Sequence, residues 1–75
     1  MKSFNEKYPY IAAWVRDGLV EIGYNEYDDA FLRVIDAGGV VWDSNKTYSN
    51  LDDAFEEMNR AIETWCTENG IKLEL

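Results

Sequence analysis

Apolar and polar residues alternate with a period of two along the first half of the chain, and recur every three to four residues along the second half. In residues 10–25, two apolar runs flank Asp17-Gly18, a pair that favours the two-residue turn of a β-hairpin. A turn of this length pairs Val15 with Val20 and gathers one apolar face toward a core. We therefore expect residues 10–25 to form a first hairpin.

A second hairpin is predicted over residues 30–43, where two runs of aliphatic and aromatic residues flank Ala37-Gly38-Gly39. Either glycine could take the left-handed position, so two registers, one residue apart, stay open. Within the first of these strands, alternation places Leu32 and Val34 on one face. The opposite face carries Phe31, Arg33 and Ile35. The all-aliphatic pair is expected to face the core.

The second half of the chain predicts one amphipathic helix over residues 50–69. Its apolar stripe consists of Leu51, Ala54, Phe55, Met58, Ala61, Ile62, Trp65 and Cys66. Ser49 or Asn50 can cap the first turn, and Gly70 can end the helix in a left-handed conformation. The tail, residues 71–75, alternates, so it either adds a short fifth strand or packs its aliphatic side chains on the core.

These elements define an α+β fold in a single domain, residues 1–75. A four-stranded antiparallel β-meander over residues 9–43 packs on one C-terminal amphipathic helix, in the order ββββα. Residues 1–8 precede the meander as a segment that could be flexible. One helix covers one face of a sheet, so the opposite face, called here the helix-free face, is expected to stay open.

The helix-free face is predicted to be unusually apolar. It carries Trp14, Leu19, Phe31 and Ile35 around Arg33, and either Val40 or Trp42 joins it according to the register of the second hairpin. Exposed patches of this kind commonly mark interfaces, where aromatic residues and arginine dominate binding. We therefore predict a non-catalytic protein–protein interaction module, either a homodimer or a binder of another protein. The alternative is that the N-terminal segment or the C-terminal tail folds across this face.

The net charge of the chain limits the kinds of partner that it can bind. Seven basic residues against fifteen acidic ones give a net charge of −8, which repels nucleic-acid phosphates and anionic membrane surfaces. The longest apolar run, residues 10–15, is far shorter than the roughly 20 residues of a membrane span. No apolar signal region follows Met1. We expect a cytoplasmic protein that binds neither nucleic acid nor membrane.

The chemistry-bearing residues do not predict an enzyme. The chain has no histidine, and the lone Cys66 supplies neither a zinc ligand set nor a Cys-His pair, so it is interpreted as a core residue. The acidic pairs Asp28-Asp29 and Asp52-Asp53 suit a solvated loop and the positive end of a helix dipole. We predict no catalytic residue, metal site or cofactor.

Two resemblances follow from short motifs. The motifs of the first are Pro9-Tyr10-Ile11, Trp14-Val15, Glu21-Ile22-Gly23, Phe31-Leu32-Arg33, Asp36-Ala37-Gly38-Gly39, Trp42 and Leu51-Asp52-Asp53-Ala54. With them, residues 9–68 resemble small, uncharacterised bacterial proteins, many of them cyanobacterial, which implies a compact ββββα domain. The segment Leu51-Asp52-Asp53-Ala54 after the strand Val40-Val41-Trp42 is similar to HicB-type antitoxin domains, which implies a partial ribonuclease-H-like fold. The alternative function that this resemblance implies is an antitoxin or an inhibitor of a basic enzyme.

Overall fold

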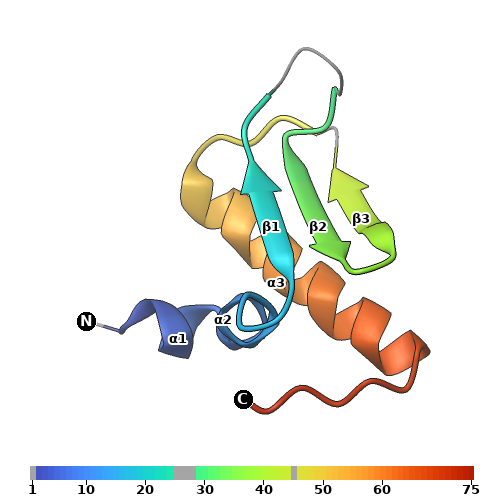
Figure 1. Cartoon of the computed structure of the whole chain (residues 1–75). Helices are drawn as coiled ribbons and strands as arrows, with labels where there is room; N and C mark the ends of the chain where they lie inside the picture. The colour runs from blue at the N-terminus through green and yellow to red at the C-terminus, as the bar shows by residue number, and fades with distance from the viewer. Residues whose placement is uncertain (1, 25–28, 45) are drawn as a thin grey trace.

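A computed structural model of the chain describes residues 2–24, 29–44 and 46–75. Three strands form one antiparallel sheet in the order β1-β2-β3, and the long C-terminal helix crosses one of its faces (Figure 1). The α+β class, with an antiparallel sheet and a C-terminal helix, is thus confirmed. The elements are α1 (Phe4–Lys7), α2 (Pro9–Trp14), β1 (Leu19–Ile22), β2 (Leu32–Asp36), β3 (Gly39–Ser44) and α3 (Leu51–Glu68).

The segment that we expected to be the first strand is helix α2 instead. Pro9 takes the first helical position, where its missing N–H leaves no helical hydrogen bond unmade. The free backbone N–H groups of Tyr10 and Ile11 both donate to Oδ1 of Asn59, at 2.8 and 3.1 Å. The first turn of α2 is therefore capped by a side chain of α3, a partner that local sequence patterns do not reveal.

Asp17-Gly18 ends this helical region rather than turning a hairpin. Neither residue has the positive φ that a type I′ turn requires. The Gly18 N–H donates to the carbonyl oxygen of Trp14 at 2.8 Å, as at the end of a helix. The chain then enters β1, and the described residues contain three strands. The predicted first hairpin is wrong, because its first half is a helix and only its second half is a strand.

The second predicted hairpin is present as β2 and β3. Asp36 pairs with Gly39, which leaves Ala37-Gly38 as a two-residue turn. Gly39 has a φ of 121°, a conformation that favours glycine. The register is irregular after this turn, because Ile35 pairs with Val40 while Val34 pairs with Trp42. One residue of β3 therefore forms a β-bulge.

Helix α3 matches its prediction closely. The Asn50 side chain caps it by accepting a hydrogen bond from the Asp53 N–H at 2.8 Å. Gly70, with a φ of 66°, follows its end. Its Glu56–Arg60 pair lies at 3.5 Å on the exposed side.

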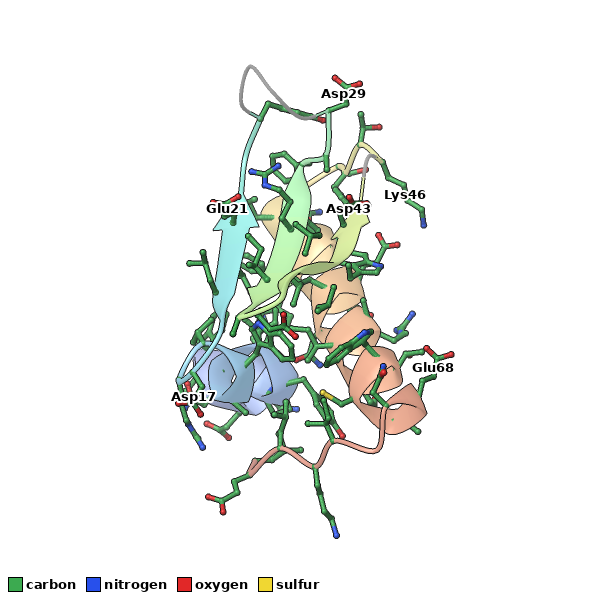
Figure 2. All side chains as sticks on the ribbon, turned by 45° about the vertical axis from the view of Figure 1, so that its right-hand side comes forward. Asp17, Glu21, Asp29, Asp43, Lys46 and Glu68 are labelled. Carbon is green, nitrogen blue, oxygen red and sulfur yellow. The ribbon has the colours of Figure 1, made fainter. Side chains whose placement is uncertain are left out.

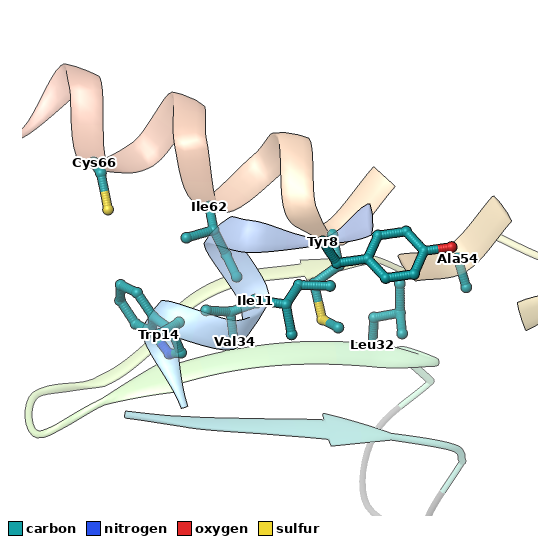
Figure 3. Close-up of a cluster of buried hydrophobic side chains, with 9 residues drawn as sticks. Tyr8, Ile11, Trp14, Leu32, Val34, Ala54, Ile62 and Cys66 are labelled. Atoms are coloured by element: carbon teal, nitrogen blue, oxygen red, sulfur yellow. The ribbon is translucent and has the colours of Figure 1, made fainter. Parts of the chain in front are cut away.

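The core lies between the sheet and the helices. Leu32 and Val34 of β2 are fully buried against α3, as their alternation predicts. Helix α2 packs beside α3 and contributes the i, i+3 pair Ile11 and Trp14 (Figure 3). The buried cluster comprises Tyr8, Ile11, Trp14, Leu32, Val34, Ala54, Met58, Ile62 and Cys66. The three aromatic and aliphatic side chains from residues 8–14 take the place of the strand that we expected.

The described terminal segments pack near α2 and α3. Phe4 and Tyr8 form an aromatic cluster with Phe55, with ring centroids 5.1 to 5.6 Å apart. The tail, residues 71–75, forms no strand, but Leu73 packs against the core and the Glu74 carbonyl accepts a hydrogen bond from Arg16 at 2.9 Å. Within the described ranges, no helix combines the length and the apolar composition needed to cross a membrane.

Candidate functional site

The helix-free face of the sheet carries two rows of side chains. Because Leu32 and Val34 point toward α3, the residues that alternate with them point away from it. The first row, called here the apolar row, runs across the three strands as Leu19, Ile35 and Val40. Its outer members, Leu19 and Val40, are 51% and 54% exposed. The structure therefore leaves aliphatic surface uncovered here.

The second row is charged and runs parallel to the first, as Glu21, Arg33 and Asp43. Glu21 on β1 and Asp43 on β3 flank the central strand (Figure 2). The Arg33 Nε donates to Glu21 Oε1 at 2.6 Å, and its other nitrogens donate to the carbonyl oxygens of Ala30 and Gly23. Arg33 is only 6% exposed. Its guanidinium thus ties Glu21 of β1, Gly23 and Ala30 to β2.

Trp14 does not lie on the helix-free face, which corrects its predicted placement. It belongs to α2, is 7% exposed, and meets Trp65 of α3 edge to face at 5.6 Å. Its Nε1–H donates to the carbonyl oxygens of Leu19 and Ile35, at 3.3 and 3.2 Å. Trp14 therefore packs in the core, and it ties α2 to β1 and β2.

Phe31 and Ile35 are half-buried. Phe31 precedes β2 and contacts the rings of Tyr24 and Tyr48, with centroids 5.2 and 6.1 Å away. It packs partly against the core, so it borders the helix-free face rather than lying at its centre. Of the five predicted interface residues, the structure places Leu19, Arg33 and Ile35 on this face.

The register of the second hairpin decides which further residue joins this face. Val40 pairs with Ile35 and completes the apolar row. Trp42 pairs with Val34 and therefore lies on the α3 side. The sequence left both alternatives open, because a single bulge in β3 exchanges them.

The contacts of the terminal segments lie away from the helix-free face. On the N-terminal side, the Tyr8 hydroxyl and Lys7 Nζ both bond to the Asp52 carboxylate, at 2.9 and 3.2 Å. These hydrogen bonds hold the pKa of Asp52 below its usual range. Leu73 of the tail lines a small cavity together with Trp14 and Gly18.

The sequence did not predict that the side chain of Ile22 is exposed. Alternation places it with Val20 on the α3 side of β1, the side that faces the core. Helix α3 packs mainly against β2 and β3, and Ile22 stays 43% exposed. No pattern within residues 19–22 signals this exposure, because it depends on where the helix crosses the sheet.

A cleft of about 440 Å³ lies between β3 and α3. Trp42 and Trp65 form its aromatic walls, and Glu57, Arg60 and Glu68 border it. Aromatic rings beside carboxylates can bind a cationic side chain.

Glu57, at the border of this cleft, is already bonded. Lys46 Nζ lies 2.8 Å from Glu57 Oε1, and the Tyr48 hydroxyl donates to Oε2. These donors hold the pKa of Glu57 below its usual range. Burial and then the bond to this carboxylate raise the pKa of Tyr48.

The remaining candidate groups offer little chemistry. Cys66 is buried in the core, and burial raises the pKa of its thiol, which disfavours the reactive thiolate. Of the acidic pairs, Asp52 and Asp53 lie in the first turn of α3, as expected, and Asp28 lies outside the described residues. In comparisons with known proteins, the chain matches no family model, and no curated protein and no solved structure matches it.

Proposed function

We propose that this protein is a non-catalytic association module that binds a second copy of itself through the side chains exposed around the helix-free face. The observation that carries the proposal is the exposure of the apolar row. Its end residues, Leu19 and Val40, are half exposed, and neither the described helices nor the terminal segments cover them. Burying such side chains in a dimer contributes about 25 cal/mol for each Å² of apolar surface.

Three of the residues first predicted for this interface keep roles in the proposal. Leu19 and Ile35 supply aliphatic contact area in the apolar row. Arg33 acts indirectly, because its hydrogen bonds to Glu21 and to backbone carbonyls tie β1 to β2. Phe31 borders the contact surface, and Trp14 supports it from the core without touching a partner.

The test compares two leucines of nearly equal exposure. Leu19 is 51% exposed at the end of the apolar row, and Leu51 is 54% exposed at the start of α3. Sedimentation velocity on the whole chain at about 0.5 mM should give twice the 8.7 kDa chain mass, since micromolar Kd values favour dimer at this concentration. Leu19→Lys should raise Kd about tenfold or more, and Leu51→Lys should leave it unchanged. A monomeric wild type, or equal effects of the two substitutions, refutes the proposal.

A second candidate function is inhibition of a basic enzyme, as an antitoxin would do. The observation that favours it is the acidity of α3, which carries six acidic residues and one arginine beside the tryptophan-lined cleft. A labelled oligo-arginine peptide should bind there, and Thr64→Arg, which adds a cation at the wall of the cleft, should weaken this binding about tenfold. Binding that the substitution leaves unchanged would be non-specific attraction to the net charge, and it would remove this candidate.

A further inference from the structure

The free edge of β1 offers backbone hydrogen-bonding groups. The sheet order makes β1 an edge strand, because among the described strands only β2 is hydrogen-bonded to it (Figure 1). The Gly23 N–H donates to the Phe31 carbonyl at 2.7 Å, and in an antiparallel ladder the inward-bonding positions alternate. Leu19 and Glu21 therefore bond to β2. The N–H and C=O groups of Val20 and Ile22 point outward, and no described residue is seen to bond to them.

The two edges of the sheet differ in how they are protected. The β3 edge carries a bulge, a device that natural sheets use to prevent the addition of another strand. The β1 edge has a regular register from Leu19 to Ile22 and contains no proline, lysine or glycine. Its side chains Leu19 and Ile22, on opposite faces, are both about half exposed. Of the two edges, β1 is the one shaped to accept a strand.

Local charge favours an uncharged strand as the occupant. Glu21 is the only ionisable side chain of β1, and it is already paired with Arg33 at 2.6 Å. Six of the acidic residues lie instead on α3, which packs against β2 and β3. A basic segment would find no unpaired carboxylate on β1, whereas another β1 strand brings aliphatic side chains and an equally neutralised glutamate.

We infer that a second copy of the chain pairs with β1 edge to edge, so that two three-stranded sheets become one antiparallel sheet of six strands. A twofold axis perpendicular to the sheet relates the copies, and each α3 lies on the same side. This inference rests on the proposed function and places the association at the β1 end of the apolar row, so that Leu19 lies in the contact and Val40 lies outside it. It also gives Ile22 a role, because pairing buries this side chain on the α3 side of the joined strands.

Charge also limits the register. Outward-pointing residues must meet one another, which allows Val20 opposite Val20, Ile22 opposite Ile22, or Val20 opposite Ile22 of the second copy. The last of these places the two Glu21 side chains directly opposite each other, and like charges in that position are destabilising. The first two place Glu21 opposite Leu19 or Gly23, so they are the registers that we expect.

The test removes one outward N–H group and keeps the ladder to β2. Val20→Pro deletes the Val20 N–H, which β2 does not use, and Val20→Ala is its matched control, because it shortens the same side chain and keeps the N–H. Sedimentation velocity at about 0.5 mM should show that Val20→Pro raises the dimer Kd about tenfold or more relative to Val20→Ala, since symmetry removes the bond twice. Equal Kd values for the two variants overturn the inference.

Val40→Lys separates this inference from the proposed function. Val40 lies on β3, at the far end of the apolar row from the β1 edge. In an edge-paired dimer, this substitution should leave Kd unchanged. If Val40→Lys dissociates the dimer and Val20→Pro does not, two helix-free faces pack against each other, so the inference fails and the proposed function stands. A monomeric wild type refutes both.

Hydrogen exchange tests the same inference without a substitution. The wild-type amides of Val20 and Ile22 should be protected at concentrations well above Kd and should exchange at least about tenfold faster well below it. The amide of Val34, in the central strand, is the internal control, and its exchange should not depend on concentration. Exchange at Val20 and Ile22 that is equally independent of concentration refutes edge pairing, even if Val20→Pro fails to fold.

Discussion

Gly18→Ala should destabilise the protein, because the side chain of Trp14 lies against Gly18. A Cβ atom built on Gly18 would lie 2.5 Å from Nε1 and 2.9 Å from Cε2 of the indole ring. Real Cβ atoms essentially never come so close, so the indole would have to move. Trp14 is buried between α3 and the sheet, and its Nε1–H bonds to two strand carbonyls, so movement breaks contacts on every side.

The expected magnitude follows from three contributions. Gly18 lacks a positive φ, so in open space alanine would stabilise the fold by about 0.4–1 kcal/mol through the entropy of the unfolded chain. Overpacking of a core costs about 1–3 kcal/mol, and each lost hydrogen bond of Trp14 costs about 0.5–1.5 kcal/mol. The net expected loss in the free energy of unfolding is about 1–5.5 kcal/mol. Steric overlap therefore reverses the sign of the effect.

The assay is urea and thermal unfolding monitored by tryptophan fluorescence. For a domain of this size, a loss of about 2 kcal/mol lowers Tm by roughly 8–16 °C. The control is Gly38→Ala, whose Cβ would meet only the Asp36 carboxylate at 3.3 Å in an exposed turn, and it should change stability by less than about 1 kcal/mol. If Gly18→Ala matches or exceeds the wild-type Tm, Trp14 does not pack as described.

Three further predictions concern single side chains. The folded-state pKa of Glu57 lies below its usual 4.5, so its ionised form stabilises the fold above pH 4.5, and this stability is lost as the pH falls through the lower, folded-state pKa. Glu57→Gln should therefore flatten the decline of Tm between about pH 5 and pH 3. An unchanged slope of Tm against pH contradicts this prediction. The buried thiol of Cys66 should react with a disulfide reagent about a hundredfold more slowly in the folded than in the urea-unfolded protein, and equal rates would show that it is accessible. Arg33→Met should lower the free energy of unfolding, measured by chemical denaturation, by about 2–3 kcal/mol, because it leaves the buried carbonyl of Ala30 without this donor. The control Arg60→Met, at an exposed position, should lower it by less than about 0.5 kcal/mol. Similar losses for the two variants would refute a structural role for Arg33.

The candidate surface could be predicted only in part. Strand alternation alone placed Arg33 and Ile35 opposite Leu32 and Val34, because a strand has only two faces. It could not reveal that Arg33 is engaged within the chain, since its acceptors on Glu21, Gly23 and Ala30 depend on how β1 and β2 pair. It also could not reveal that Ile22 stays exposed, because that depends on where α3 crosses the sheet.

The sequence by itself determined the second hairpin and helix α3. Their signals are local and agree with one another: a glycine turn between β-branched runs in the hairpin, and a capped apolar stripe ended by Gly70 in the helix. Tertiary structure decided the segment before β1. Its apolar residues fit a period of two as well as a period of three, so the sequence pattern is compatible with a strand and with a helix. The segment forms a helix because Asn59 caps its first turn and because Ile11 and Trp14, three residues apart, both reach the core. Trp14 therefore packs beneath the sheet instead of on its open face.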